Sequence, residues 1–264
     1  MPTLSRHFLY TFEIMEEKKL SVLATGLIAL AVVLSALILG SAYKYKFIAN
    51  ETISTTGLAE KEFTSDLANW SAQVYVMNSD KKEAYSQLKI DIAKVREYLK
   101  NKGFADSEIV LLSVNAERTF REETTHGPNG YETIKNIPDD YKLYQYISIE
   151  SKKVDLVEKT AREITDLMNE GINIDSESPN YYYSKLEDLK ISLIANATEN
   201  GTTRAKNIAE KGNSTLGSLK SAVMGVFQIT GKHSSEDYSY GGIFNTSDKE
   251  KKASITMRLE FGIR

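Results

Sequence analysis

The chain contains one long run without charge, LSVLATGLIALAVVLSALILGSA, which extends from Leu20 to Ala42. An α-helix rises about 1.5 Å per residue, so this run would span roughly 35 Å, close to the ~30 Å hydrocarbon thickness of a bilayer. The apolar core of a secretory signal is usually shorter, about 7 to 15 residues. We therefore predict a transmembrane helix, although small residues at the cleavage positions also suit a cleaved signal. The positions that represent this anchor are Leu20, Leu27, Leu30, Val33, Leu37 and Ala42.

Basic residues on the two sides of this run predict its orientation. Arg6, Lys18 and Lys19 precede it, whereas only Lys44 and Lys46 follow it closely. The positive-inside rule therefore favours a cytoplasmic N-terminus. The predicted organisation is a short cytoplasmic tail, a transmembrane helix in the lipid bilayer, a tether and one extracytoplasmic domain, at residues 1–19, 20–42, 43–50 and 51–264.

Composition excludes several kinds of chemistry. The chain has 33 Lys and Arg against 36 Asp and Glu, for a formal net charge of −3. No cluster of basic residues stands out after the anchor, so we expect no nucleic-acid partner. Cysteine is absent, which excludes thiol nucleophiles, thiolate metal sites and disulfides.

Hydrophobic spacing predicts the first elements of the domain. Residues 53–77 are typical of two strands around a charged bend near Glu60 to Glu62. An amphipathic helix is predicted over 79–102 and ends at Gly103. Strands at 109–121 and 141–150 follow, with a long polar loop over 122–140. The helix prediction rests on apolar residues at steps of three and four, which are Tyr85, Leu88, Ile92, Val95 and Leu99.

The second half repeats this pattern. A helix is predicted from Val154 to Met168 through Val157, Ala161 and Ile164, followed by an aromatic strand over 172–184. Strands over 219–230 and 253–263, joined by a loop over 231–250, complete an α+β order. Before them a third helix is predicted over 184–211, and its buried side is expected to contain Leu186, Leu189, Leu193, Ala197, Ala205 and Ile208.

Candidate sites are few. The histidines His7, His126 and His233 lack metal-ligand spacing, and no nucleophile-elbow, phosphate-loop or dinucleotide motif is present. We therefore predict no catalytic residues, metal or cofactor. Tyrosines are the concentrated feature, and they could line a ligand groove or pack in the core or in a subunit interface. These candidate positions are Tyr131, Tyr141, Tyr181, Tyr182, Tyr183 and Tyr238.

Three segments resemble the SIMPL-domain family. The first is ISTTGLAEKEFTSDLANWSAQV, with Gly57 and Asp66 at recognisable positions. The third is the alternating C-terminal strand. One departure is Gly201, where the family usually has Ala, so we expect a less regular helix there. The second segment, from Ser178 to Ala222, is the most specific, and its matching positions are Tyr182, Lys185, Leu186, Leu189, Lys190, Ala197, Arg204, Ala205, Leu216 and Gly217.

This resemblance implies a fold and a setting. The implied fold is α+β, with amphipathic helices packed on a twisted mixed or antiparallel sheet. Members of the family look like envelope proteins without agreed enzymatic activity, connected with stress tolerance, and some form ring-like oligomers. We therefore expect a non-enzymatic, single-pass protein of a bacterial inner membrane, with its domain in the periplasm or outside, that assembles as a homo-oligomer into a scaffold. The alternative is a monomeric ligand-binding or enzymatic module with a tyrosine-lined groove.

Overall fold

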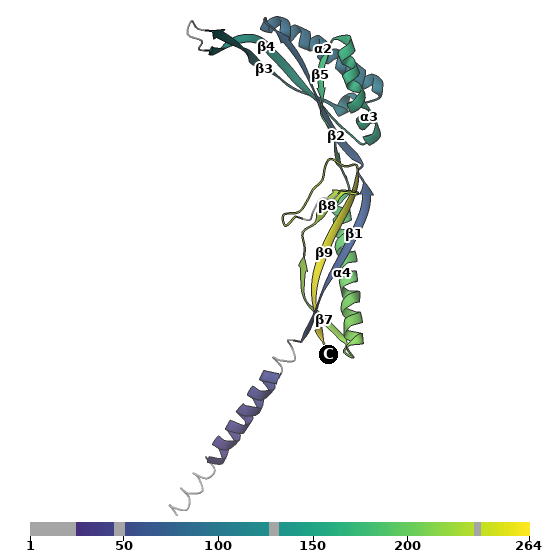
Figure 1. Cartoon of the computed structure of the whole chain (residues 1–264). Helices are drawn as coiled ribbons and strands as arrows, with labels where there is room; N and C mark the ends of the chain where they lie inside the picture. Colours follow the sequence, from purple (N-terminus) through teal and green to yellow (C-terminus); the bar gives the residue numbers. More distant parts are fainter. Residues whose placement is uncertain (1–24, 45–50, 127–131, 235–238) are drawn as a thin grey trace, which may run out of the picture. The chain divides into compact units, whose positions relative to one another are not determined.

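The computed structural model describes residues 25–44, 51–126, 132–234 and 239–264. It confirms the predicted α+β class, with helices and antiparallel sheets (Figure 1). The described residues divide into two compact units. One contains 56–201 and 224–257, and the other contains the described parts of 1–55 together with 202–223 and 258–264.

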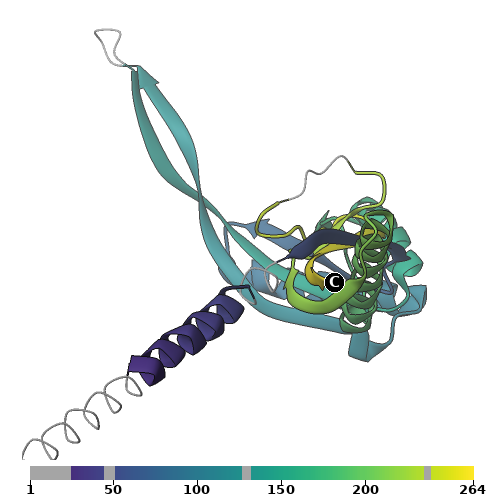
Figure 2. The same cartoon turned by 90° about the horizontal axis from the view of Figure 1, so that it is seen from below.

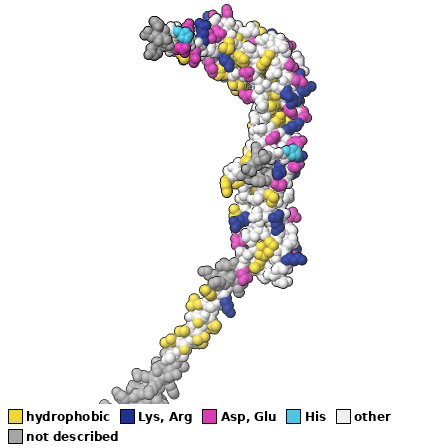
Figure 3. Space-filling model, viewed as in Figure 1, with side chains coloured by type: hydrophobic (Ala, Val, Ile, Leu, Met, Phe, Trp, Pro, Cys, Tyr) yellow, Lys and Arg dark blue, Asp and Glu magenta, His cyan; other side chains and the backbone are white. Residues whose placement is uncertain are grey.

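An apolar helix extends from Thr25 to Lys44, with a mean hydropathy of 2.2. Its 20 residues are long enough to cross a bilayer at about 1.5 Å per residue. None of the helix is buried, and Figure 3 shows hydrophobic side chains along its visible face. Leu20 lies outside the described residues. The helix fits either a membrane anchor or a signal sequence.

A five-stranded sheet forms much of the larger unit. Its central strand β2 (Leu67–Asn78) pairs antiparallel with β4 (Glu132–Ser151) on one side. On the other side it pairs with two short strands, β5 (Asn173–Ser176) and β6 (Asn180–Tyr182). The edge strand β3 (Ile109–His126) pairs with β4. The single aromatic strand predicted over 172–184 is therefore wrong, because Pro179, which lacks a backbone N–H, lies between two separate strands.

Two helices pack their apolar faces on this sheet in one hydrophobic core. Helix α2 (Lys81–Lys102) begins after Asp80, whose carboxylate accepts from Lys82 N and Glu83 N, and it ends at Gly103 with a φ of 106°. Helix α3 spans Val154–Glu163. Of the predicted apolar face of α2, Tyr85 is exposed, contrary to the prediction. The other predicted positions of the two helices, as far as Ile164, are buried beside Trp70 and Ile147, among them Leu88, Ile92, Val95, Val157, Ala161 and Ile164.

The helix predicted to run to Met168 ends earlier. After α3 the chain tightens into the 3-10 helix η2 (Ile164–Glu170), which is followed by Gly171 with a φ of 82°. A 3-10 helix has three residues per turn. Leu167, three residues after Ile164, is therefore buried, and Met168 is exposed.

The long polar loop predicted over 122–140 is also wrong. β3 continues to His126 and β4 begins at Glu132, so most of the predicted loop is strand, and its residues 127–131 lie outside the described residues. Figure 2 shows these two strands as a twisted ribbon that extends away from the helices. Pro138 fits into this ribbon opposite Phe120, next to a register shift, because proline is tolerated at edges and bulges of a sheet.

The other sheet has the strand order β1-β9-β7, with β8 also paired to β9. These strands are β1 (Thr52–Thr64), β7 (Leu216–Met224), β8 (Gln228–Gly231) and β9 (Glu250–Ile263). The bend predicted near Glu60 is absent, and the chain turns instead at Ser65 and Asp66. The charged residues of the predicted bend lie within β1 instead. Ion pairs to neighbouring segments stabilise them there, joining Glu60 to Lys252 at 3.5 Å and Glu62 to Lys232 at 3.1 Å.

The strand predicted over 219–230 is two strands, β7 and β8, separated at 225–227. Gly225 marks the break, because a Cβ atom there would lie 2.2 Å from the hydroxyl oxygen of Thr256. In β9 the predicted alternation is confirmed for the four residues Ile255, Met257, Leu259 and Phe261, which are buried, whereas Ile263 is half-buried.

Helix α4 spans Leu186–Lys211 and continues through Gly201 without interruption, so the irregularity expected there is absent. Its buried positions recur every fourth residue from Leu189, and most of them are small. Because this step continues from Ala205 to Ala209, Ile208 is exposed, contrary to the prediction. The residues of the buried stripe are Leu189, Leu193, Ala197, Gly201, Ala205 and Ala209.

Candidate functional site

The outer part of the β3–β4 hairpin is the most unusual surface of the described chain. β2 ends at Asn78, which pairs with Tyr141, so no third strand in the described part of the chain lies beside residues 119–126 and 132–140. We call these two segments the arm. Along β3 only Ile109 is buried and Thr119 half-buried. A two-stranded hairpin is at best marginally stable alone in water, so contacts beyond its own strand pairing would stabilise the arm.

Exposed apolar side chains mark the arm and the edge strand that leads to it. Phe120 on β3 and Ile134 on β4 are 61% and 60% exposed. Nearer the core, Val110, Leu112 and Val114 are also exposed along β3. An uncovered edge strand presents backbone N–H and C=O groups to which another strand can pair. The surface therefore combines hydrogen-bonding capacity with apolar area.

Charged and aromatic side chains at the base of the arm are paired with each other. The Arg118 guanidinium lies 4.4 Å from the centre of the Tyr141 ring, and the Lys142 ammonium lies 4.7 Å from that of Tyr75. The Tyr144 hydroxyl donates to Glu117 at 2.8 Å, and this hydrogen bond raises the pKa of the Tyr144 phenol. These contacts stiffen the base from which the arm extends.

The candidate tyrosines that the structure describes do not line one groove. Tyr141 pairs with Asn78 at one end of β2, and Tyr182 pairs with Leu67 at the other. At about 3.3 Å per residue these ends are roughly 35 Å apart. Tyr131 and Tyr238 lie outside the described residues.

The three consecutive tyrosines have separate surroundings. Tyr181 is buried in the hydrophobic core, and burial raises the pKa of its phenol. The ring centre of Tyr182 is 6.5 Å from that of Phe244. The ring centre of Tyr183 is 4.9 Å from that of Phe63. Tyr181 is therefore a core residue, while Tyr182 and Tyr183 are half-buried among other aromatic residues.

A buried lysine beside these rings was missed at the level of sequence. Lys251 is 2% exposed, its ammonium donates to the Tyr181 carbonyl oxygen, and burial lowers its pKa to about 8. The alternation of inward- and outward-facing residues along β9 could have predicted this burial. Lys251 stands in phase with Ala253 and Ile255, so extending the alternation by one step places it on the buried face.

Asp66, a recognisable family position, joins two segments of the larger unit. One of its carboxylate oxygens accepts from Ser184 N and the other from the Ser184 hydroxyl, both at 2.6 Å. Burial alone would raise the pKa of Asp66, but the hydrogen bonds from Ser184 outweigh it and hold the pKa below its ordinary value. An ionised Asp66 thus fixes the turn after β1 to the segment before α4.

The remaining family positions make packing contacts or lie at the surface. Leu189, Ala197 and Ala205 are buried. Lys190 pairs with Glu187 at 2.8 Å. Gly217 lies against Gly262, because a Cβ atom on Gly217 would be 2.7 Å from the Gly262 carbonyl oxygen. Leu186 and Leu216 are half-buried, whereas Lys185 and Arg204 are exposed.

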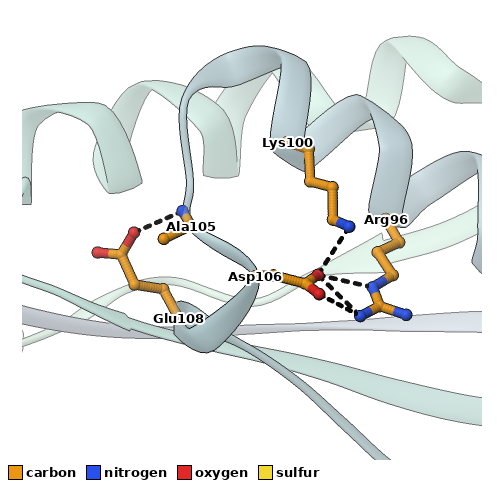
Figure 4. A network of polar contacts seen from close by, with 5 residues as sticks. All are labelled: Arg96, Lys100, Ala105, Asp106 and Glu108. Carbon is orange, nitrogen blue, oxygen red and sulfur yellow. Dashed lines mark hydrogen bonds and ion pairs between the residues drawn. The ribbon is translucent and has the colours of Figure 1, made fainter.

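A polar network ties the end of α2 to the start of β3 (Figure 4). Asp106, in the short 3-10 helix η1 (Asp106–Glu108), accepts from Arg96 at 2.7 Å and from Lys100 at 2.9 Å. Hydrogen bonds from Lys100 and Arg96 hold the pKa of Asp106 below its ordinary value. Glu108 accepts from Ala105 N at 2.8 Å. These carboxylates are ionised and engaged in joining two elements.

Metal-binding side chains do not converge in the described part of the chain, where no group of three or more His, Asp or Glu is placed to hold an ion. His126 lies on the arm, 3.5 Å from Glu132. His233 follows β8, and His7 lies outside the described residues.

Fold and surface together define a class of protein: an α+β domain of antiparallel sheets, preceded by one helix apolar enough to cross a membrane. The chain belongs to the SIMPL family, whose model matches residues 53–256 and is described as a protein of unknown function (DUF541). This confirms the resemblance seen in the sequence. No curated protein matches the chain significantly.

Proposed function

We propose that this protein is a non-enzymatic, membrane-anchored scaffold that assembles with copies of itself through the arm and the β3 edge. The observation that carries the proposal is the arm itself. Its two strands extend beyond the last residue of β2, and no other described strand pairs with them. Pairing with the same surface of another copy would supply the missing neighbour and cover Phe120 and Ile134.

The setting supports this proposal. A helix that holds each copy in one membrane plane raises the local concentration of the domains, so that weak contacts suffice. The domain would lie outside the cytoplasm, in the periplasm of a bacterial inner membrane, where an assembly of this kind could contribute to stress tolerance of the envelope. A closed arrangement is required, because contacts that repeat without closing give filaments.

The full chain in detergent provides the test. Replacing the exposed apolar residues of the arm, Phe120→Asp with Ile134→Asp, should convert a discrete oligomer into smaller species in sedimentation velocity. The matched control is Ile191→Asp with Ile208→Asp, which changes two exposed isoleucines of α4 and should leave the oligomer unchanged.

Two outcomes would overturn the proposal. The first is an oligomer that survives the arm substitutions while the protein remains folded by circular dichroism. The second is an unmodified chain that sediments as a monomer at high micromolar concentration.

A further inference from the structure

A cleft of about 570 Å³ opens on one face of the β1-β9-β8 sheet, within the larger unit. It is lined by Leu58 of β1, three residues of β9, two residues at or before β8, and a turn of the following loop. The lining residues are Leu58, Val226, Gln228, Ser239, Tyr240, Ser254, Ile255 and Thr256. Its volume lies in the range of about 300 to 1,000 Å³ that is typical of small-molecule sites.

The cleft lies on the face of the sheet away from α4. Gly57 faces the helix, because a Cβ atom on it would lie 1.9 Å from the Ala197 carbonyl oxygen. Neighbouring residues of a strand point to opposite faces. Leu58 therefore points away from α4 and into the open, where it is 43% exposed.

Hydrogen bonds and close packing hold one wall of the cleft in place. The buried Gln228 side chain donates to the Ser239 carbonyl oxygen at 2.8 Å and accepts from Ile243 N at 2.7 Å. Gly242, with a φ of 88°, closes the turn and packs so tightly that an added Cβ would lie 2.9 Å from Val226. Each end of the Gln228 amide thus makes a hydrogen bond to the protein, which holds this side chain in place.

The chemistry of the lining indicates an uncharged, apolar occupant. None of the eight lining residues carries a charge, in a chain of which 26% of residues are charged. Val226 is 46% exposed, and the Tyr240 side chain is fully exposed on the fixed turn above the cleft. Apolar groups gathered on one open site favour a ligand that removes them from water. An aromatic ring with a polar end suits the boundary between an apolar chain and solvent.

We propose that this cleft binds the aliphatic chain of a single-chain amphiphile, such as a fatty acid. Leu58 and Val226 contact the methylene groups, and Tyr240 covers the chain at the open side. The polar head lies outside, since the lining offers it no charge. This binding site is independent of the arm, which lies on the other sheet.

Photolabelling of the full chain in phosphatidylcholine nanodiscs tests the site. The probe is palmitate with a diazirine in mid-chain, and digestion with mass spectrometry locates the attached label. We expect labelling of segments that contain Leu58, Val226 or Thr256. Leu58→Glu should reduce it at least about tenfold, because a charge in an apolar site costs more than the 1.4 kcal/mol that corresponds to tenfold. Ile191→Glu, on exposed α4 surface, should leave it unchanged.

The alternatives give distinct results. Val226→Glu serves in place of Leu58→Glu if the thermal midpoint of the latter is lowered. A second preparation carries the same diazirine chain on phosphatidylcholine, and cleft labelling by this lipid alone would overturn the single-chain assignment. Labelling confined to the 25–44 helix would overturn the proposal, as would a cleft that instead crosslinks to another copy of the chain.

Discussion

Gly57 of β1 lies in direct contact with Ala197 of α4: a Cβ atom on Gly57 would be 1.9 Å from the Ala197 carbonyl oxygen and 2.6 Å from Gly201 N. No side chain fits between this strand and this helix. The relationship explains two features of the sequence at once. A glycine stands in an otherwise Thr-rich strand, and small residues recur every fourth position along the helix.

The first prediction tests this contact. Gly57→Ala should lower the free energy of unfolding by at least about 1 to 3 kcal/mol, the usual cost of an overpacked core, because both clashing groups are backbone. Urea titration followed by circular dichroism measures the change. Gly241→Ala is the matched control, since its Cβ would meet only a serine hydroxyl at 3.9 Å. Equal stability of the two variants would contradict the packing.

A second prediction concerns the core beneath α2. Ile92 is buried against the five-stranded sheet, so Ile92→Ala should cost about 2 to 5 kcal/mol through lost burial and a cavity. Ile191 is 66% exposed on α4, and Ile191→Ala should change stability by less than about 0.5 kcal/mol. A loss at Ile92 as small as at Ile191 would mean that the α2 face is not core.

The third prediction is a pH dependence set by Lys251. Burial lowers its folded-state pKa to about 8, whereas an unfolded lysine titrates near about 10.4. Between these values the unfolded chain binds the proton and the folded chain does not, so stability rises with pH in this window and is constant below pH 8.

Comparison with a variant isolates this effect from other groups that titrate at high pH. The unfolding free energy of the native chain minus that of Lys251→Met should increase by about 1 to 3 kcal/mol from pH 8 to pH 10. Lys211→Met, at an exposed site, should show no such increase. A flat difference for Lys251→Met would show that the ammonium is solvated in the folded protein.

The fourth prediction concerns orientation and uses the absence of cysteine. We expect a single cysteine placed by Ser107→Cys, an exposed residue of η1, to react with a membrane-impermeant maleimide in intact spheroplasts. Ser5→Cys in the N-terminal tail should react only after lysis, because the basic residues favour a cytoplasmic tail. The reverse pattern would place the domain in the cytoplasm.

Local periodicity determined much of this protein from the sequence alone. Leu88, Ile92 and Val95 share one side of a helix whatever lies opposite, and Gly103 ends that helix because it tolerates a positive φ. Likewise, the length and composition of the uncharged run that begins at Leu20 are sufficient to predict a helix that can cross a membrane. These features depend on neighbours within a few residues along the chain.

Tertiary structure decided what depends on distant partners. The segments 122–126 and 132–140 look like a polar loop in sequence, and they become strands because each pairs with the other. Alternation along β9 indicates the face to which Lys251 points, but only the tertiary structure brings the carbonyl oxygen of Tyr181, seventy residues away, to its ammonium. Gly57 has a role only because α4 passes over it. Long-range pairing and close packing between separated segments are set by three-dimensional proximity, which periodicity along one segment does not encode.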